Sequence, residues 1–223
     1  MSAQPEELEQ IYRTRFAANQ DYRRRVWQVL TRHFFGRWLR PTDTVLDLGC
    51  GYGEFINQIQ CAKKFGMDLN PESPKHLAPG VEFLNQDCST AWGMAPGTLD
   101  VVFTSNFFEH LPSKESLGST LDQAHRSLRP GGRLIALGPN IKYLPGAYWD
   151  FWDHYLPLTE LSLAEGLRNR GFEIETSHAR FLPYTMVNAP QYPTILLRLY
   201  LAVPILWRFF GGQFLVVARK QGG

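Results

Sequence analysis

The chain has 223 residues, enough for one domain with a substantial core and too few for two large domains. Hydrophobic residues make up 44% of it and the net charge is +2, which indicates a globular protein without bulk affinity for polyanions. Its three cysteines have no metal-binding spacing and their number is odd, which favours a reduced, cytoplasmic protein. No metal ion is expected, and no stretch is long and apolar enough to span a bilayer.

Residues 6–39 carry apolar side chains at roughly helical spacing, which predicts one or two helices before Pro41. Many arginines lie between the apolar positions. They fit the solvated face of a helix, or a lid over a neighbouring ligand site. We therefore expect an N-terminal helical cap, residues 1–40, and a main domain, residues 41–223. The arginines are Arg13, Arg15, Arg23, Arg24, Arg25, Arg32, Arg37 and Arg40.

Residues 44–55 contain three glycines at alternate positions after a short apolar run, and apolar residues at helical spacing follow them. This pattern predicts a buried strand at 44–48, a tight turn and a helix at about 54–61. Glycine reaches backbone angles that are closed to other residues and lets a ligand approach the main chain. A helix behind such a turn directs its N–H groups at that ligand. The glycines are Gly49, Gly51 and Gly53.

The charges around this turn narrow the choice of ligand. Asp47 precedes the glycines, and Glu54 occupies the position of the third glycine in the dinucleotide fingerprint G-x-G-x-x-G. Two carboxylates repel a pyrophosphate but attract a ligand that carries an ammonium and a sulfonium group. S-adenosylmethionine (SAM) carries both groups and is the expected cofactor.

The series Asp47, Gly49, Gly51 and Gly53 resembles, position for position, the motif Asp/Glu-x-Gly-x-Gly-x-Gly of class I (Rossmann-like) SAM-dependent methyltransferases. The resemblance implies an α/β fold with a doubly wound, seven-stranded, mostly parallel sheet, an antiparallel last strand and helices on both faces. It also implies transfer of the sulfonium methyl group to an oxygen or a nitrogen.

Further positions take predicted SAM-binding roles. A strand at about 64–68 ends in Asp68, about 20 residues after the glycine turn, where nucleotide-binding βαβ units have the acid that accepts both ribose hydroxyls. Leu69 follows it in the same site, and the alternative role for Asp68 is that of a turn aspartate. Segments before the glycine motif often cap SAM in this family, so Tyr12 or Arg15 is expected to meet the methionine carboxylate.

Strands at about 81–84 and 99–105 each lead into a predicted ligand loop. After the first, the resemblance implies that the Asp87 carboxylate receives the adenine amino group and that the backbone N–H of Cys88 pairs with the ring. A helix N-cap is the alternative for Asp87. After the second, Asn106 is the natural contact to SAM, because ligands of open α/β sheets lie beyond the carboxyl ends of the strands.

The second of these loops ends in Glu-His-Leu-Pro, which resembles the small-molecule branch of the family. Glu109 and His110 are the nearest candidate proton acceptors, and a histidine titrates near working pH. The alternative is that His110 packs against adenosine or caps a helix. Residues 139–158 form a strongly aromatic loop, either a wall of the acceptor pocket or a packed Ω-like loop. His154 and Tyr155 in this loop are further proton acceptors.

The stretch 194–210 is apolar on nearly every side. It either packs on the sheet or forms an exposed apolar surface for a partner protein, a lipid-carried substrate or a membrane. The other predicted elements are a helix at 114–128, a turn at 129–132, a strand at 133–137, a helix at 159–171, and strands at 172–180 and 214–219.

The loop after residue 105 also narrows the acceptor. Amino methylation of adenine or glutamine in this family uses an Asp/Asn-Pro-Pro-Tyr turn, and no proline follows Asn106 directly. Cytosine C5 methylation needs a cysteine nucleophile, and residues 106–112 contain none. These absences point away from nucleic acid and favour a small molecule, a sugar or a lipid-linked acceptor. A macromolecular acceptor (protein or RNA) and a non-catalytic SAM-binding or partner-binding module are the alternatives, and the oligomeric state is left open.

Overall fold

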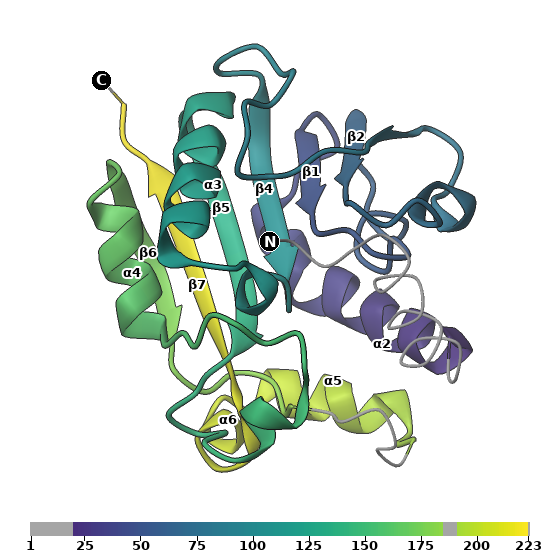
Figure 1. The fold of residues 1–223 in the computed structure, drawn as a ribbon. Helices are drawn as coiled ribbons and strands as arrows, with labels where there is room; N and C mark the ends of the chain where they lie inside the picture. The colour runs from purple at the N-terminus through teal and green to yellow at the C-terminus, as the bar shows by residue number, and fades with distance from the viewer. Residues whose placement is uncertain (1–19, 185–190, 223) are drawn as a thin grey trace.

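A seven-stranded sheet forms the centre of the computed structural model, which describes residues 20–184 and 191–222 (Figure 1). The strands are β1 (Thr44–Leu48), β2 (Lys63–Met67), β3 (Val81–Leu84), β4 (Leu99–Ser105), β5 (Leu128–Pro139), β6 (Phe172–His178) and β7 (Gln213–Lys220). Their order is β3-β2-β1-β4-β5-β7-β6, and β7 is antiparallel to both of its neighbours whereas the other pairs are parallel. The predicted doubly wound sheet with an antiparallel last strand is confirmed.

Helices cover both faces of this sheet (Figure 1). One face carries α3 (Lys114–Ser127) and α4 (Glu160–Arg168), and the other carries α2 (Gln20–His33), α5 (Thr194–Ala202) and α6 (Ile205–Phe210). Successive strand residues serve the two layers in turn: Leu46 belongs to the core under α3 and α4, and Val45 belongs to the other core. This alternation follows from the pleat of a strand, whose neighbouring side chains point to opposite faces.

Aromatic rings attach α2 to the sheet. Trp27 of α2 lies edge-on to Phe103 of β4 with ring centroids 5.9 Å apart, and Phe55 stacks on Phe103 at 3.6 Å. Because aromatic side chains bury large apolar areas, this cluster holds the described part of the N-terminal segment as a layer of the main fold. The division into cap and main domain after Arg40 stays a prediction, since residues 1–19 lie outside the described residues.

The helix predicted at 54–61 is wrong as a regular helix, because residues 51–58 form consecutive turns. The side chain of Asn57 donates a hydrogen bond to the carbonyl of His76 at 2.9 Å and accepts one from the N–H of Ala78 at 2.8 Å. Such side-chain bonds to a neighbouring backbone segment compete with a helical ladder. The glycine loop is therefore held by turns and long-range polar contacts.

Two other elements differ from the predicted ones. Residues 129–132, expected as a turn, are the first part of β5, and a register shift in its pairing with β4 lies between Leu99 and Val101. The stretch 194–210 is two short helices with a break at Pro204, whose ring disfavours a continuous helix. Within residues 20–184 and 191–222, every helix is too short or too polar to cross a bilayer.

Candidate active site

The glycine loop lies at the switch point of the sheet, where β1 is flanked by β2 and β4. Gly49, Gly51 and Gly53 have φ angles of 70°, 52° and 75°, in the left-handed region that glycine adopts without steric cost. A Cβ on Gly49 would lie 2.3 Å from the ring of Phe107, so the loop after β4 packs directly on the glycine loop. The two loops border one site at the carboxyl ends of the strands.

Asp68 ties the end of β2 to the glycine loop. Its Oδ2 accepts a hydrogen bond from the N–H of Gly51 at 2.8 Å, and its Oδ1 accepts one from the N–H of Asn70 at 2.9 Å. The carboxylate therefore has the turn role that was the alternative at this position. Two carboxylate oxygens offer about four acceptor positions, so the turn role and the predicted role toward the ribose do not exclude each other. Leu69 follows Asp68 and is half-buried.

Negative charge gathers around the glycine loop. Burial raises the pKa of Asp47 well above its ordinary value, and the charges of Glu54 and Asp68 raise it further against a hydrogen bond from the backbone of Ile56. Arg23 of α2 forms an ion pair with Glu54 and neutralises part of this charge. A cationic ligand in the loop would offset the remaining repulsion, whereas a pyrophosphate would add to it.

The loop after β3 positions the predicted adenine contacts. Oδ1 of Asp87 accepts hydrogen bonds from the N–H and the hydroxyl of Ser89, at 2.8 and 2.7 Å. The carbonyl of Cys88 accepts a bond from Nε1 of Trp92 at 2.8 Å, and the Cys88 thiol lies 3.3 Å from the hydroxyl of Thr120. Both residues are thus fixed in place, and their adenine-binding roles stay predictions. Tyr12 and Arg15 lie outside the described residues.

Asn106 begins the loop after β4 in an unusual conformation. Its φ of 50° is left-handed, and its N–H donates to the carbonyl of Leu137 in β5 at 2.8 Å. Asparagine tolerates this region better than most residues because its side chain hydrogen-bonds locally. Its amide lies 3.3 Å from the Ser105 hydroxyl and the residue is exposed, which leaves the side chain accessible at the edge of the site.

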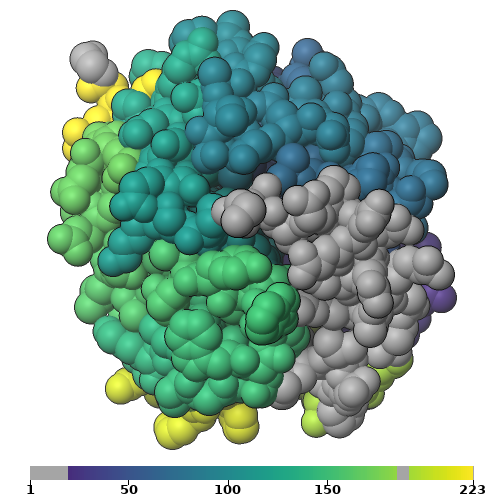
Figure 2. Space-filling model, viewed as in Figure 1, coloured from purple at the N-terminus to yellow at the C-terminus, as the bar shows by residue number. Residues whose placement is uncertain are grey.

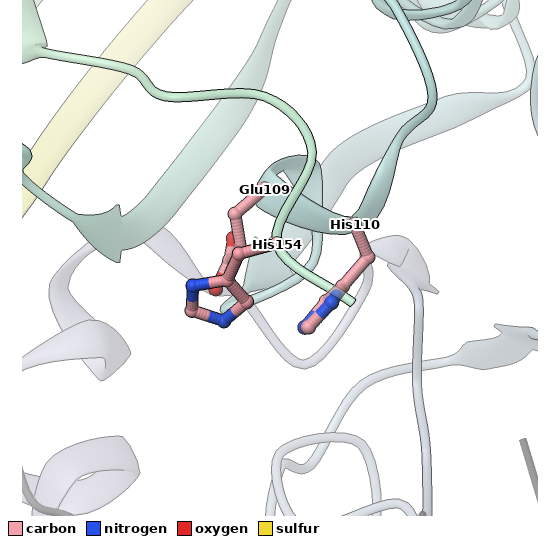
Figure 3. Close-up of side chains that lie close together, drawn as sticks. All are labelled: Glu109, His110 and His154. Carbon is pink, nitrogen blue, oxygen red and sulfur yellow. The ribbon is translucent and has the colours of Figure 1, made fainter. Parts of the chain in front are cut away.

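Glu109, His110 and His154 form one polar cluster (Figure 3). Each offers a ligand-type atom, and these atoms all lie within 4.8 Å of one another. Glu109 and His154 are buried, and the ring centroids of the two histidines are 5.0 Å apart. The structure therefore brings together three of the four predicted proton acceptors, and Tyr155 lies outside this cluster.

The loop after β5 supplies the second half of this cluster. The carbonyl of Glu109 accepts hydrogen bonds from the N–H groups of Tyr155 and Leu156, at 2.9 and 3.0 Å. In Figure 2 the green surface of the segment around residue 150 adjoins the teal surface around residue 110. Trp149 and Trp152 in this loop are 56% and 81% exposed, so only part of the aromatic loop is core.

Asp153 is a candidate site residue that was not predicted from the sequence. Nδ1 of His110 lies 2.8 Å from its carbonyl oxygen and 3.1 Å from its Oδ2. Burial lowers the pKa of His110, but the hydrogen bond to Asp153 and the charges of Glu109 and Asp153 together raise it above the ordinary value. Burial raises the pKa of Glu109 to about 7, against a smaller opposing effect of His110. Two acid–histidine dipeptides, residues 109–110 and 153–154, were the signal in the sequence.

Fold, glycine loop and surrounding acids together define a class I SAM-dependent methyltransferase. Residues 19–177 match the model of a methyltransferase family, described as a methyltransferase domain. The chain belongs to this methyltransferase family, and SAM is its cofactor.

Individual proteins that resemble this chain share at most a quarter of its residues in the comparisons that follow. The chain is 25% identical over 213 residues to a protein of Symbiobacterium thermophilum named demethylmenaquinone methyltransferase, and the match covers 82% of this chain and 78% of the relative. A SAM-dependent methyltransferase from Archaeoglobus fulgidus has a similar fold, with a TM-score of 0.67, 19% identity and coverage of 92% of this chain and 99% of the other. A complex that contains the Haloferax volcanii Trm112 methyltransferase activator includes a chain with a TM-score of 0.67, 17% identity and coverage of 92% and 93%.

Proposed function

We propose that this enzyme transfers the methyl group of SAM to an oxygen or nitrogen of a small-molecule, sugar or lipid-linked acceptor. The observation that carries the proposal is the acid–imidazole cluster between the loops after β4 and β5, in which Glu109 and His154 are buried and His110 is half-buried. It begins two residues after Phe107, which packs on Gly49 of the glycine loop. Donor and acceptor sides of the site are thus joined through one short segment.

SAM binding is assigned to the residues around the glycine loop. Asp47 and Glu54 attract the positive charges of SAM, and Asp68 accepts hydrogen bonds from the ribose hydroxyls. Asp87 accepts a hydrogen bond from the adenine amino group, and the backbone N–H of Cys88 donates to the adenine ring. The methyl group is already activated by the sulfonium, so the enzyme gains most by holding donor and acceptor in line at near-attack distance.

The acceptor side is assigned to the acid–imidazole cluster. His110, whose Nδ1 faces Asp153, directs its Nε2 away from that carboxylate. A histidine held in this way is suited to take the proton of an acceptor hydroxyl, with Asp153 as a positioning residue. Glu109 and His154 line the same cluster. The Symbiobacterium relative acts, by its name, on demethylmenaquinone, which supports a small-molecule acceptor.

Labelled methyl transfer tests this proposal. The purified full-length chain is titrated with SAM by calorimetry and then incubated with labelled SAM and separate pools of small metabolites, lipid extract, protein and RNA. We expect SAM binding and label in the small-molecule or lipid pool. Label confined to protein or RNA would show that the acceptor is a macromolecule and would overturn the proposed acceptor class. SAM binding without transfer to any pool would favour a non-catalytic module.

An apolar face on α5 and α6 favours an acceptor carried in a lipid phase. Seven of its large apolar side chains are 41–68% exposed: Ile195, Leu196, Leu199, Val203, Ile205, Phe209 and Phe210. Arg198 and Arg208 lie in the same helices, and no acidic residue follows Glu175 in the sequence. Apolar helices with arginines are suited to the surface of an anionic membrane. We infer that this face rests on such a membrane.

The apolar face adjoins the acceptor loop. The guanidinium of Arg180 lies 4.8 Å from the ring centroid of Tyr143 in the loop after β5, and it donates to the carbonyls of Phe209 and Gly211 at 2.9 and 2.8 Å. Figure 1 places α6 beside that loop at one end of the molecule. A protein docked through α5 and α6 would therefore present its acceptor side close to the lipid surface.

A further inference from the structure

The cluster of Glu109, His110 and His154 has the donor set of a metal site. It combines one carboxylate with two imidazoles, and the sets of two histidines and one carboxylate found in zinc and iron enzymes have this composition. Two of the residues come from the loop after β4 and the third from the loop after β5, and their ligand-type atoms converge within 4.8 Å (Figure 3). The expectation of no metal was based on the spacing of the cysteines. The cluster contains no cysteine, and its residues come from two loops that are distant in the sequence.

The contacts behind the two imidazoles favour ligation. Nδ1 of His110 faces the carbonyl and carboxylate oxygens of Asp153 at 2.8 and 3.1 Å, and Nδ1 of His154 faces the carbonyl of Tyr148 at 2.8 Å. These oxygens accept hydrogen bonds, so each Nδ1 is the donor and the lone pair of the neutral ring lies on Nε2. Metal-binding histidines in proteins are held in this way, with the second ring nitrogen donating to a carbonyl or carboxylate.

We propose that Glu109, His110 and His154 bind one first-row transition-metal dication, and that this ion holds the acceptor oxygen. The role rests on the proposed methyl transfer. Imidazole donors favour zinc or iron over magnesium and calcium, which prefer all-oxygen sites. Bonds of roughly 2.0–2.2 Å place tetrahedral donors about 3.4 Å apart, so the widest separation in the cluster, up to 4.8 Å, has to shorten by up to about 1.4 Å.

Three protein ligands leave coordination positions open for the acceptor. A hydroxyl bound there becomes more acidic and releases its proton to solvent, so the bound ion takes the place of His110 as the group that promotes deprotonation. Its oxygen then forms the bond to the methyl carbon as the carbon–sulfur bond breaks, the electron pair stays on sulfur, and S-adenosylhomocysteine leaves.

Metal binding to the full-length chain tests the site directly. After treatment with a chelator, the protein is titrated with Zn²⁺ by calorimetry, and with Co²⁺ as a spectroscopic probe whose visible absorption reports imidazole ligation. We expect one ion per chain in wild type, and at least about tenfold weaker binding in Glu109→Gln and in His154→Gln. His33→Gln is the matched control, because His33 is an exposed histidine at the end of α2.

Three results would overturn the metal site: no ion bound by the wild-type chain, binding unchanged in both cluster variants, or binding lost equally in the His33 control. Circular dichroism shows whether each variant is folded, and the wild-type titration decides the question even if a cluster variant is not. SAM affinity is measured in the same samples. If the wild-type chain binds SAM but no metal ion, only the metal site is overturned. If the wild-type chain does not bind SAM, the proposed function is overturned.

Discussion

The cofactor side and the acceptor side of this site are built in different ways. The cofactor side is one continuous stretch, residues 47–53, whose backbone is held by Asp68 from the neighbouring strand end. The acceptor side consists of side chains from two loops, in which His110 meets Asp153 across 43 residues. Backbone geometry therefore decides the first region, and packing between loops decides the second.

This difference explains why one fold accommodates many acceptors. A glycine loop has little freedom to change, since its conformation is set by φ angles and close contacts. The loops after β4 and β5 lie at the surface of the sheet, so their side chains can change with little effect on the packing of the core. Substitutions on the cofactor side and on the acceptor side should therefore have separable effects on stability, SAM affinity and methyl transfer.

Gly49→Ala should be the most damaging change on the cofactor side. Alanine at this position would have to adopt a φ of 70°, and its Cβ would lie 2.3 Å from Phe107. We therefore expect a loss of about 2–5 kcal/mol in the free energy of unfolding. Gly80→Ala is the matched control: its φ is 88°, but nothing lies within 4 Å of the added atom, and about 1–2 kcal/mol is expected. Chemical denaturation measures both. Equal losses would show that the contact with Phe107 does not hold the two loops together.

Asp68→Ala should weaken SAM binding by at least about tenfold. It leaves a ribose diol and the N–H of Gly51 without their acceptor, and unpaired polar groups of this kind cost roughly 1–3 kcal/mol. Glu82→Ala, an exposed acid on β3, removes the same charge and should leave the affinity unchanged. Calorimetric titration with SAM that gives one affinity for both variants would remove Asp68 from the site.

The cofactor side was largely predictable from the sequence, and the helix that was predicted wrongly there has a long-range cause. β1 and β4 have the predicted bounds, because a buried parallel strand is a continuous apolar run bounded by turn residues. The helix at 54–61 was not found, because the contacts of Asn57 with residues 76–78 are long-range. Periodicity reports which residues are buried and does not report such bonds.

The acceptor side was predictable only as a set of residues. The loop after β4 identified Glu109 and His110, and His154 entered as a further proton acceptor of an aromatic loop. Their meeting, and the role of Asp153 behind His110, depends on the docking of the loop after β5 on the carbonyl of Glu109. No local pattern specifies that contact, since it follows from the packing of the whole sheet.

Asp153→Asn tests the acceptor side without touching the cofactor side. Loss of the carboxylate behind His110 should lower kcat for methyl transfer by about 10–100-fold, because the imidazole loses its orientation, while SAM affinity stays within about twofold. Asp150→Asn, an exposed acid in the same loop, is the control and should leave kcat unchanged. A variant that loses SAM affinity as much as kcat would show that the two sides are not separable.

The smallest effect on SAM binding is expected at the apolar face, which adjoins the loop after β5 and lies away from the cofactor side. Replacing Phe209 and Phe210, which are 68% and 64% exposed, by serine should reduce binding to vesicles that contain phosphatidylglycerol by at least about tenfold and leave SAM affinity unchanged. Leu161→Ser is the control, because Leu161 is 59% exposed on α4, which covers the opposite face of the sheet. Co-sedimentation at two salt concentrations separates the apolar contribution from that of the arginines, because only the latter is screened. If the double variant and the control sediment alike, the face has another occupant, and the acceptor has to reach the loop after β5 from solution.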